Sequence, residues 1–129
     1  MPSIFTRILR GEIPCHEVGR SERFLAFLDI HPLREGHTLV IPHVEVDKLF
    51  DLDDDLLAGM LPFAKEVAFR IEKVVPCARV GVAVLGLEVP HAHLHLVPMD
   101  SERDLEFSRP KLKMGQEELA ALAKRIREA

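Results

Sequence analysis

The sequence has no tryptophan, tyrosine or asparagine, and Cys15 and Cys77 are its only cysteines. These two residues lie far apart in the chain and do not form the Cys-x-x-Cys pair of a zinc or redox site, so we expect both to be reduced, packed thiols. Long apolar runs are also missing. Charged residues or proline interrupt every apolar stretch within about ten residues, whereas a membrane-spanning helix needs about 20. The sequence therefore predicts no membrane span.

A large excess of positive charge is absent as well. The chain has 17 lysines and arginines against 21 acidic residues, for a net charge of -4. Without a broad basic field, neither nucleic acid nor an anionic membrane is an expected partner, although a small anion could still bind locally. The first residues do not resemble a signal peptide, because Arg7 and Arg10 interrupt the apolar positions. We expect a cytoplasmic protein.

The 129 residues, 47% of them hydrophobic, are enough for one globular domain with a substantial core. Apolar spacing predicts a short helix over residues 4–9, capped by Ser3, and a long helix over about 53–75 that Pro62 should kink or divide. A final amphipathic helix is expected at about 116–128, and strands at about 16–19, 24–28, 38–41, 79–85 and 91–98. This order favours an α+β fold with an antiparallel sheet of about five strands.

Three histidines occupy alternate positions in the fifth expected strand: His91, His93 and His95. Because successive side chains of a strand point to opposite faces, the three imidazoles should share one face. A single histidine in such a place is most often a buried structural residue, but this explanation is weaker for three.

A metal site and nucleophilic catalysis are the other interpretations of this run. On a strand, residues 91 and 95 would lie roughly 13 Å apart at about 3.3 Å per residue, too far for both to bind one ion. A neutral imidazole attacks phosphorus well near pH 7, and flanking imidazoles can donate hydrogen bonds to phosphate oxygens or to a leaving group. Catalysis therefore explains a row of three better than a single metal does.

The run resembles the signature of the histidine triad family, His-x-His-x-His followed by apolar positions, in the form His91-Ala92-His93-Leu94-His95-Leu96-Val97. Other blocks of the family occur in the family's order: Ser3-Ile4-Phe5-Thr6-Arg7-Ile8, Gly11-Glu12-Ile13-Pro14, Phe24-Leu25-Ala26-Phe27-Leu28-Asp29-Ile30 and Gly36-His37-Thr38-Leu39-Val40-Ile41-Pro42. The resemblance to the nucleotide-binding branch of this family covers residues 3–98, and the tail from residue 100 onward lies outside it.

This resemblance implies a homodimer with the histidine triad fold that binds a purine nucleotide of the AMP or GMP type and cleaves a bond to its α-phosphate, often a phosphoramidate. His93 corresponds to the nucleophile, and His95 to the residue at the phosphate and leaving group. His91 and His37 correspond to supporting histidines, and Asp29 to the carboxylate that holds the ribose hydroxyls. The residues that correspond to the apolar base pocket are Ile4, Phe5, Ile8, Phe27 and Ile30.

The chain departs from the family's pattern just before the triad. Members often place Gln and Ser there, and a phosphate-facing Asn on the preceding strand, where this chain reads Val84-Leu85-Gly86-Leu87-Glu88-Val89-Pro90. Glu88 occupies the position at which family members often have the serine hydroxyl, and it lies next to Val89 in the stretch that corresponds to the nucleotide-binding residues. A second anion repels a phosphate unless a cation or proton intervenes. One hypothesis is that Glu88 recognises an amine on the leaving group.

The leading hypothesis is a nucleoside phosphoramidase or related nucleotidyl hydrolase that needs no cofactor. The alternatives are a nucleotide-binding module with vestigial catalysis and, less favoured, a histidine metal-binding protein. Some members have a zinc site whose first ligands are a Cys-x-x-Cys pair near the amino terminus. This chain lacks that site, because it has Ser3-Ile4-Phe5-Thr6 at the corresponding positions. We expect residues 1–99 to form the nucleotide-binding domain. Residues 100–129 should add a charged extension with a helix to the same unit, where it either closes the pocket or extends a dimer contact.

Overall fold

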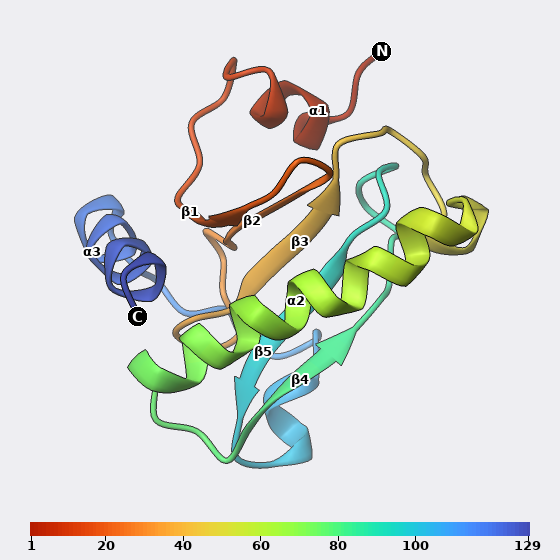
Figure 1. The fold of residues 1–129 in the computed structure, drawn as a ribbon. Helices are drawn as coiled ribbons and strands as arrows, with labels where there is room; N and C mark the ends of the chain where they lie inside the picture. The colour runs from red at the N-terminus through yellow and green to blue at the C-terminus, as the bar shows by residue number, and fades with distance from the viewer.

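The computed structural model describes all 129 residues. Five strands form one antiparallel sheet in the order β1-β2-β3-β5-β4 (Figure 1). The strands are β1 (Glu17–Arg20), β2 (Phe24–Leu28), β3 (Thr38–Pro42), β4 (Arg79–Ala83) and β5 (Leu94–Met99). The helices are α1 (Ile4–Leu9), α2 (Asp54–Val74) and α3 (Gln116–Arg127), with short 3-10 turns η1 (Leu49–Asp51) and η2 (Glu102–Leu105). The predicted α+β class, five-stranded antiparallel sheet and three helices are confirmed. None of the helices combines the length and the apolar composition that a membrane span requires.

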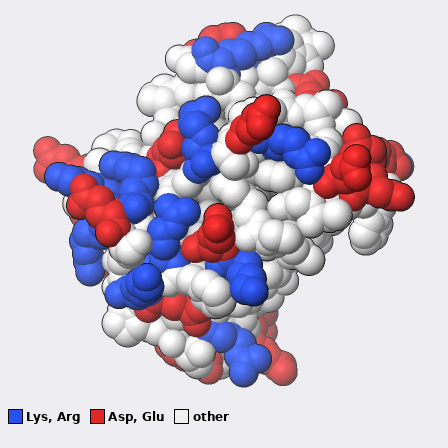
Figure 2. All heavy atoms as spheres, viewed as in Figure 1, with Lys and Arg blue, Asp and Glu red and all other residues white.

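The long helix α2 begins at an acidic cap. The Asp53 carboxylate accepts a hydrogen bond from the backbone N–H of Leu56 at 2.8 Å, and Asp54 and Asp55 add favourable negative charge to the first turn. Figure 2 shows acidic side chains gathered where α2 begins. The helix continues over 21 residues through Pro62, so of the two predicted effects of this proline, a kink or a division, the division does not occur. Apolar residues on both sides of the proline are buried, and this burial outweighs the one hydrogen bond that proline removes.

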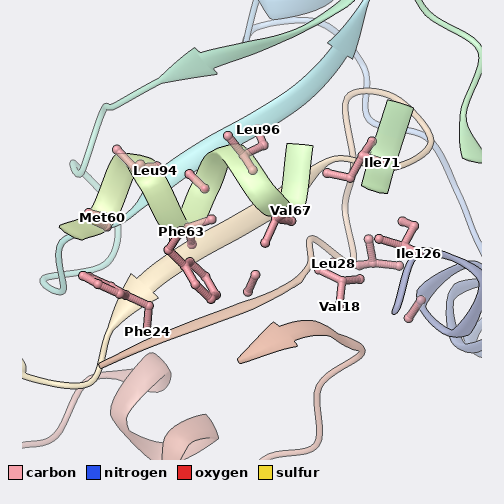
Figure 3. Packing of buried hydrophobic residues seen from close by; sticks show 14 of the residues in the cluster. Val18, Phe24, Leu28, Met60, Phe63, Val67, Ile71, Leu94, Leu96 and Ile126 are labelled. Atoms are coloured by element: carbon pink, nitrogen blue, oxygen red, sulfur yellow. The ribbon is translucent and has the colours of Figure 1, made fainter. Parts of the chain in front are cut away.

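Helices α2 and α3 cover one face of the sheet, where 19 buried residues form the main core. Figure 3 shows Phe63 and Val67 of α2 among these residues, together with Leu94 and Leu96 of β5. Four residues of α3 belong to the same cluster, so the C-terminal tail is part of the core. Each large apolar side chain that leaves water contributes about 1.5–3 kcal/mol, which makes this face the main source of stability.

The opposite face of the sheet has a smaller apolar cluster of five buried residues: Phe5, Leu25, Phe27, Leu39 and Ile41. Phe5 brings α1 onto this face, and the odd-numbered residues of β2 and β3 point toward it. The register places Phe27 opposite Leu39, and Leu39 opposite His95. Phe27, Leu39 and His95 therefore lie side by side on neighbouring strands, so the apolar cluster adjoins a histidine.

Strand β5 begins at Leu94, so the prediction that this strand also contains His91 and His93 is wrong. Strand β3 ends at Pro42, which has no N–H to donate to a neighbouring strand. The Pro42 carbonyl instead accepts a hydrogen bond from Nε2 of His91 at 2.9 Å, and the His91 carbonyl accepts one from Nδ1 of His93 at 2.7 Å. Side-chain hydrogen bonds thus replace the strand pairing here.

Candidate active site

A pocket of about 600 Å³ opens on the sheet face opposite α2, a volume within the range of small-molecule sites. Four of its polar residues come from three segments: Asp29 follows β2, His37 precedes β3, His93 directly precedes β5 and His95 is the second residue of that strand. The structure brings all the predicted nucleotide-binding residues to this pocket: Ile4, Phe5, Ile8, Phe27, Asp29, Ile30, Glu88 and Val89. Of the four predicted catalytic histidines, His91 alone does not line it.

His37 and His95 form a buried pair whose proton positions are set by the backbone. Nδ1 of His37 accepts a hydrogen bond from the Leu33 N–H at 3.0 Å, so the single proton of the neutral ring is on Nε2. This Nε2–H donates to Nδ1 of His95, also at 3.0 Å. His95 therefore carries its own proton on Nε2, where it can donate to a phosphate oxygen or a leaving group.

His93 has the opposite tautomer. Its Nδ1–H donates to the carbonyl oxygen of His91 at 2.7 Å, so its Nε2 keeps an unshared electron pair. The ring centroids of His93 and His95 lie 5.0 Å apart, and Phe5 contacts the His93 ring edge-on at the same distance. Two adjacent rings of the pocket wall thus offer a nucleophilic nitrogen and a hydrogen-bond donor.

His91 is fully buried behind the pocket, in a network with α1. Because its Nε2 proton is donated to β3, its Nδ1 accepts a hydrogen bond from the Ser3 hydroxyl at 2.8 Å. Glu45 accepts hydrogen bonds from the Ser3 N–H and the Thr6 hydroxyl, each at 2.6 Å, and these hydrogen bonds lower the pKa of Glu45 to about 2. The network fixes the His91 carbonyl and, through it, the tautomer of His93.

Burial disfavours the charged form of the histidines around the pocket. It lowers the pKa of His37 to about 3, with the charge of His95 as a second cause, and that of His95 to about 4, with His93 as a second cause. Burial also lowers the pKa of His91. For Asp29, burial raises the pKa of the carboxyl, while a hydrogen bond from the His31 N–H at 2.8 Å opposes this shift. At neutral pH, His37, His91 and His95 are therefore uncharged.

Asp29, His37 and His95 are also the one group of side chains in the chain that could hold a metal ion, since their ligand atoms lie within 4.8 Å of one another. The hydrogen bonds account for this arrangement without a metal. The only proton of neutral His37 is on Nε2, and a metal at that atom would have to displace it. We therefore assign the group to hydrogen bonding.

Two side chains of the C-terminal tail reach the pocket, a contact that the sequence analysis does not predict. The Phe107 ring meets His95 edge-on, with the centroids 4.7 Å apart, and Lys111 lines the pocket. Phe107 is the only aromatic residue after Pro98, a signal that could have marked it. Nothing in the sequence sets Lys111 apart from its neighbours, and the same holds for Glu45 in the network behind the pocket.

Comparisons with known proteins find similar chains. The family described as the HIT domain matches residues 10–102. A relative from Schizosaccharomyces pombe, named adenosine 5'-monophosphoramidase, is 35% identical over 98% of this chain and 96% of its own. A HIT-like protein from Bartonella henselae has a TM-score of 0.84 at 28% identity, covering 98% of this chain and 95% of that one. A hypothetical histidine triad nucleotide-binding protein from Sulfolobus tokodaii has a TM-score of 0.81 at 30% identity, covering 96% and 89%.

The low pKa of His37 makes stability depend on pH. Its pKa is 6.5 without burial and about 3 in the folded protein, so between these values the unfolded chain alone binds the proton. The contribution of neutral His37 to the free energy of unfolding should be complete above pH 6.5, and the free energy of unfolding should fall as the pH is lowered from there toward 4. Urea unfolding at several pH values measures this slope. His37→Asn should reduce it, whereas His43→Asn at an exposed position should not, and equal slopes in both variants would refute the explanation.

Proposed function

This chain belongs to the HIT domain family, and from this premise we propose that it hydrolyses a purine nucleoside phosphoramidate or a related nucleotide at the α-phosphate. The observation that carries the proposal is the pair of opposite tautomers on His93 and His95, which puts an electron pair and an N–H on adjacent rings of one pocket wall. The name of the fission-yeast relative, adenosine 5'-monophosphoramidase, supports the same class of reaction.

In the proposed reaction, Nε2 of His93 attacks the α-phosphorus. A bond between Nε2 and phosphorus forms while the bond between phosphorus and the amine nitrogen breaks, and the amine takes up a proton delivered at Nε2 of His95. Water then breaks the bond to His93, which restores the imidazole, releases the nucleoside monophosphate and returns one proton. The carbonyl of His91 stabilises the positive charge that the His93 ring acquires during attack.

The rest of the pocket fits a nucleoside. Asp29 directly follows β2. One of its carboxylate oxygens accepts a hydrogen bond from the His31 N–H, and the other, 3.7 Å from Nε2 of His37, accepts none and is available to the ribose hydroxyls. Phe5 and Phe27 are buried at the base of the pocket, whereas Ile4 and Ile30 are 48% and 50% exposed at its edge. A purine ring that covers these two side chains would bury apolar area. We also propose that Glu88, exposed at the pocket, recognises the leaving amine.

Amine release from an adenosine phosphoramidate tests this function. His93→Ala should reduce kcat/KM by about 10⁴-fold or more, because no other side chain replaces the covalent route. His43→Ala at an exposed position is the matched control and should keep wild-type activity. Unchanged turnover in His93→Ala would refute the proposal. A wild-type protein that binds AMP without turnover would instead identify a binding module.

We further propose that the chain forms a homodimer through α2 and β4. Strand β4 is an edge of the sheet, and an exposed apolar edge otherwise tends to aggregate. Next to it, a hollow of about 430 Å³ is lined mostly by apolar residues of α2 and β4. Leu61 and Val82 in this hollow are 59% and 48% exposed. A second copy would cover this apolar surface.

Light scattering tests the dimer. Wild type should have twice the mass of one chain, and Val82→Lys should be monomeric because it places a charge at the centre of the contact. Phe50→Lys changes a side chain that is 87% exposed elsewhere on the surface, and it should leave the mass unchanged. A monomeric wild type at working concentration would contradict the proposal.

A further inference from the structure

The pocket contains acidic groups but little positive charge. Among the residues that line it, Asp29 and Glu88 are acidic, and Lys111 is the only lysine or arginine. His37 and His95 are uncharged at neutral pH and can offer hydrogen bonds but no net charge. A nucleotide brings a phosphate anion into this pocket, so Lys111 is the one fixed cation available to it.

Lys111 is held close to the polar end of the pocket. The N–H of the next residue, Leu112, donates to the Pro32 carbonyl at 2.8 Å, which fastens the tail beside the turn that follows Asp29. The Lys111 ammonium donates to the carbonyl oxygens of Phe107 and Arg109. Because an ammonium has three N–H groups, one remains for a ligand.

The charge of Lys111 acts on the groups that would surround a nucleotide. Burial is the largest influence on the pKa of both Asp29 and His37, and in each case the charge of Lys111 lowers the pKa. An ammonium whose field reaches these two side chains also reaches an anion bound beside them in the same pocket.

Asp104 holds the tail in this position. Its carboxylate accepts hydrogen bonds from the Asp100 N–H at 2.7 Å, from Arg34 at 2.8 Å and from Arg109 at 3.2 Å. These contacts, with the backbone hydrogen bond from Asp100 as the largest cause, lower the pKa of Asp104 to about 2. Arg34 belongs to the loop that leads to His37, so the tail and the loop of the catalytic pocket are joined by charged hydrogen bonds.

We propose that Lys111 binds the phosphate of the nucleotide and that the tail forms one wall of the substrate site. This proposal rests on the proposed function, because the anion is the substrate's own phosphate. The ammonium takes the place of the neutral phosphate contacts that are missing from the stretch before the triad. It also supplies the cation that lets a phosphate bind in a pocket with Glu88.

Titration calorimetry with AMP and with adenosine tests the role of Lys111. Lys111→Met keeps most of the aliphatic length and removes the charge. It should weaken AMP binding by about 10- to 100-fold, the effect of one charge-assisted hydrogen bond, and leave adenosine binding unchanged. Lys111→Arg should keep most of the AMP affinity. Lys113→Met, two residues further along and outside the pocket, should change neither affinity.

The salt dependence gives a second measurement. AMP binding to wild type should weaken as salt is raised, and this dependence should be smaller in Lys111→Met. Lys111→Met with wild-type AMP affinity would overturn the proposal while phosphoramidate turnover upheld the proposed function. Loss of adenosine binding as well in Lys111→Met would mean that the residue is structural, which also overturns it. A wild type with neither AMP binding nor turnover would overturn both proposals.

Discussion

The hydrogen bond from His93 Nδ1 to the His91 carbonyl is the contact on which the rest of the site depends. The pairing of β3 with β5 ends at Val40 and Leu94, so the His91 carbonyl lies outside this pairing and accepts the hydrogen bond from the His93 ring. The contacts of His91 with Ser3 hold that carbonyl in place from behind, so the amino-terminal helix contributes to the pocket without supplying a reacting group. One backbone oxygen thereby leaves an electron pair on the far side of the ring.

Burial determines the charge of the pocket. The side chains that line it include neutral imidazoles in a low-dielectric environment, where hydrogen bonds are stronger than in water and an uncompensated charge is costly. Neutral donors alone bind a phosphate weakly in the presence of nearby carboxylates. The C-terminal tail, packed into the core through α3 and held by Asp104, brings Lys111 and Phe107 to this pocket. The tail is therefore part of the site as well as part of the fold.

The sequence predicts the fold class and most elements because their apolar periodicity is local and strong, as in α2 and β2. The histidine run and the blocks around it also indicate which residues gather at the pocket. The start of β5 differs from the prediction, because hydrogen bonds from the His91 and His93 side chains compete with strand pairing. No local pattern marks Glu45 or Lys111, because the hydrogen bonds of Glu45 and the pocket position of Lys111 join segments distant in sequence. The hydrogen bond between Ser3 and His91 spans 88 positions and leaves no local pattern.

The most direct test of the account is to trap the reaction during turnover. Wild-type protein is mixed with excess adenosine phosphoramidate, quenched under conditions that preserve phosphorus–nitrogen bonds, digested and examined by mass spectrometry. The account predicts a nucleoside monophosphate attached to the peptide that contains His93, localised by fragmentation to that imidazole and lost once substrate is consumed. Steady turnover with no adduct, or with an adduct on another residue that forms and decays at the rate of turnover, would contradict the central claim.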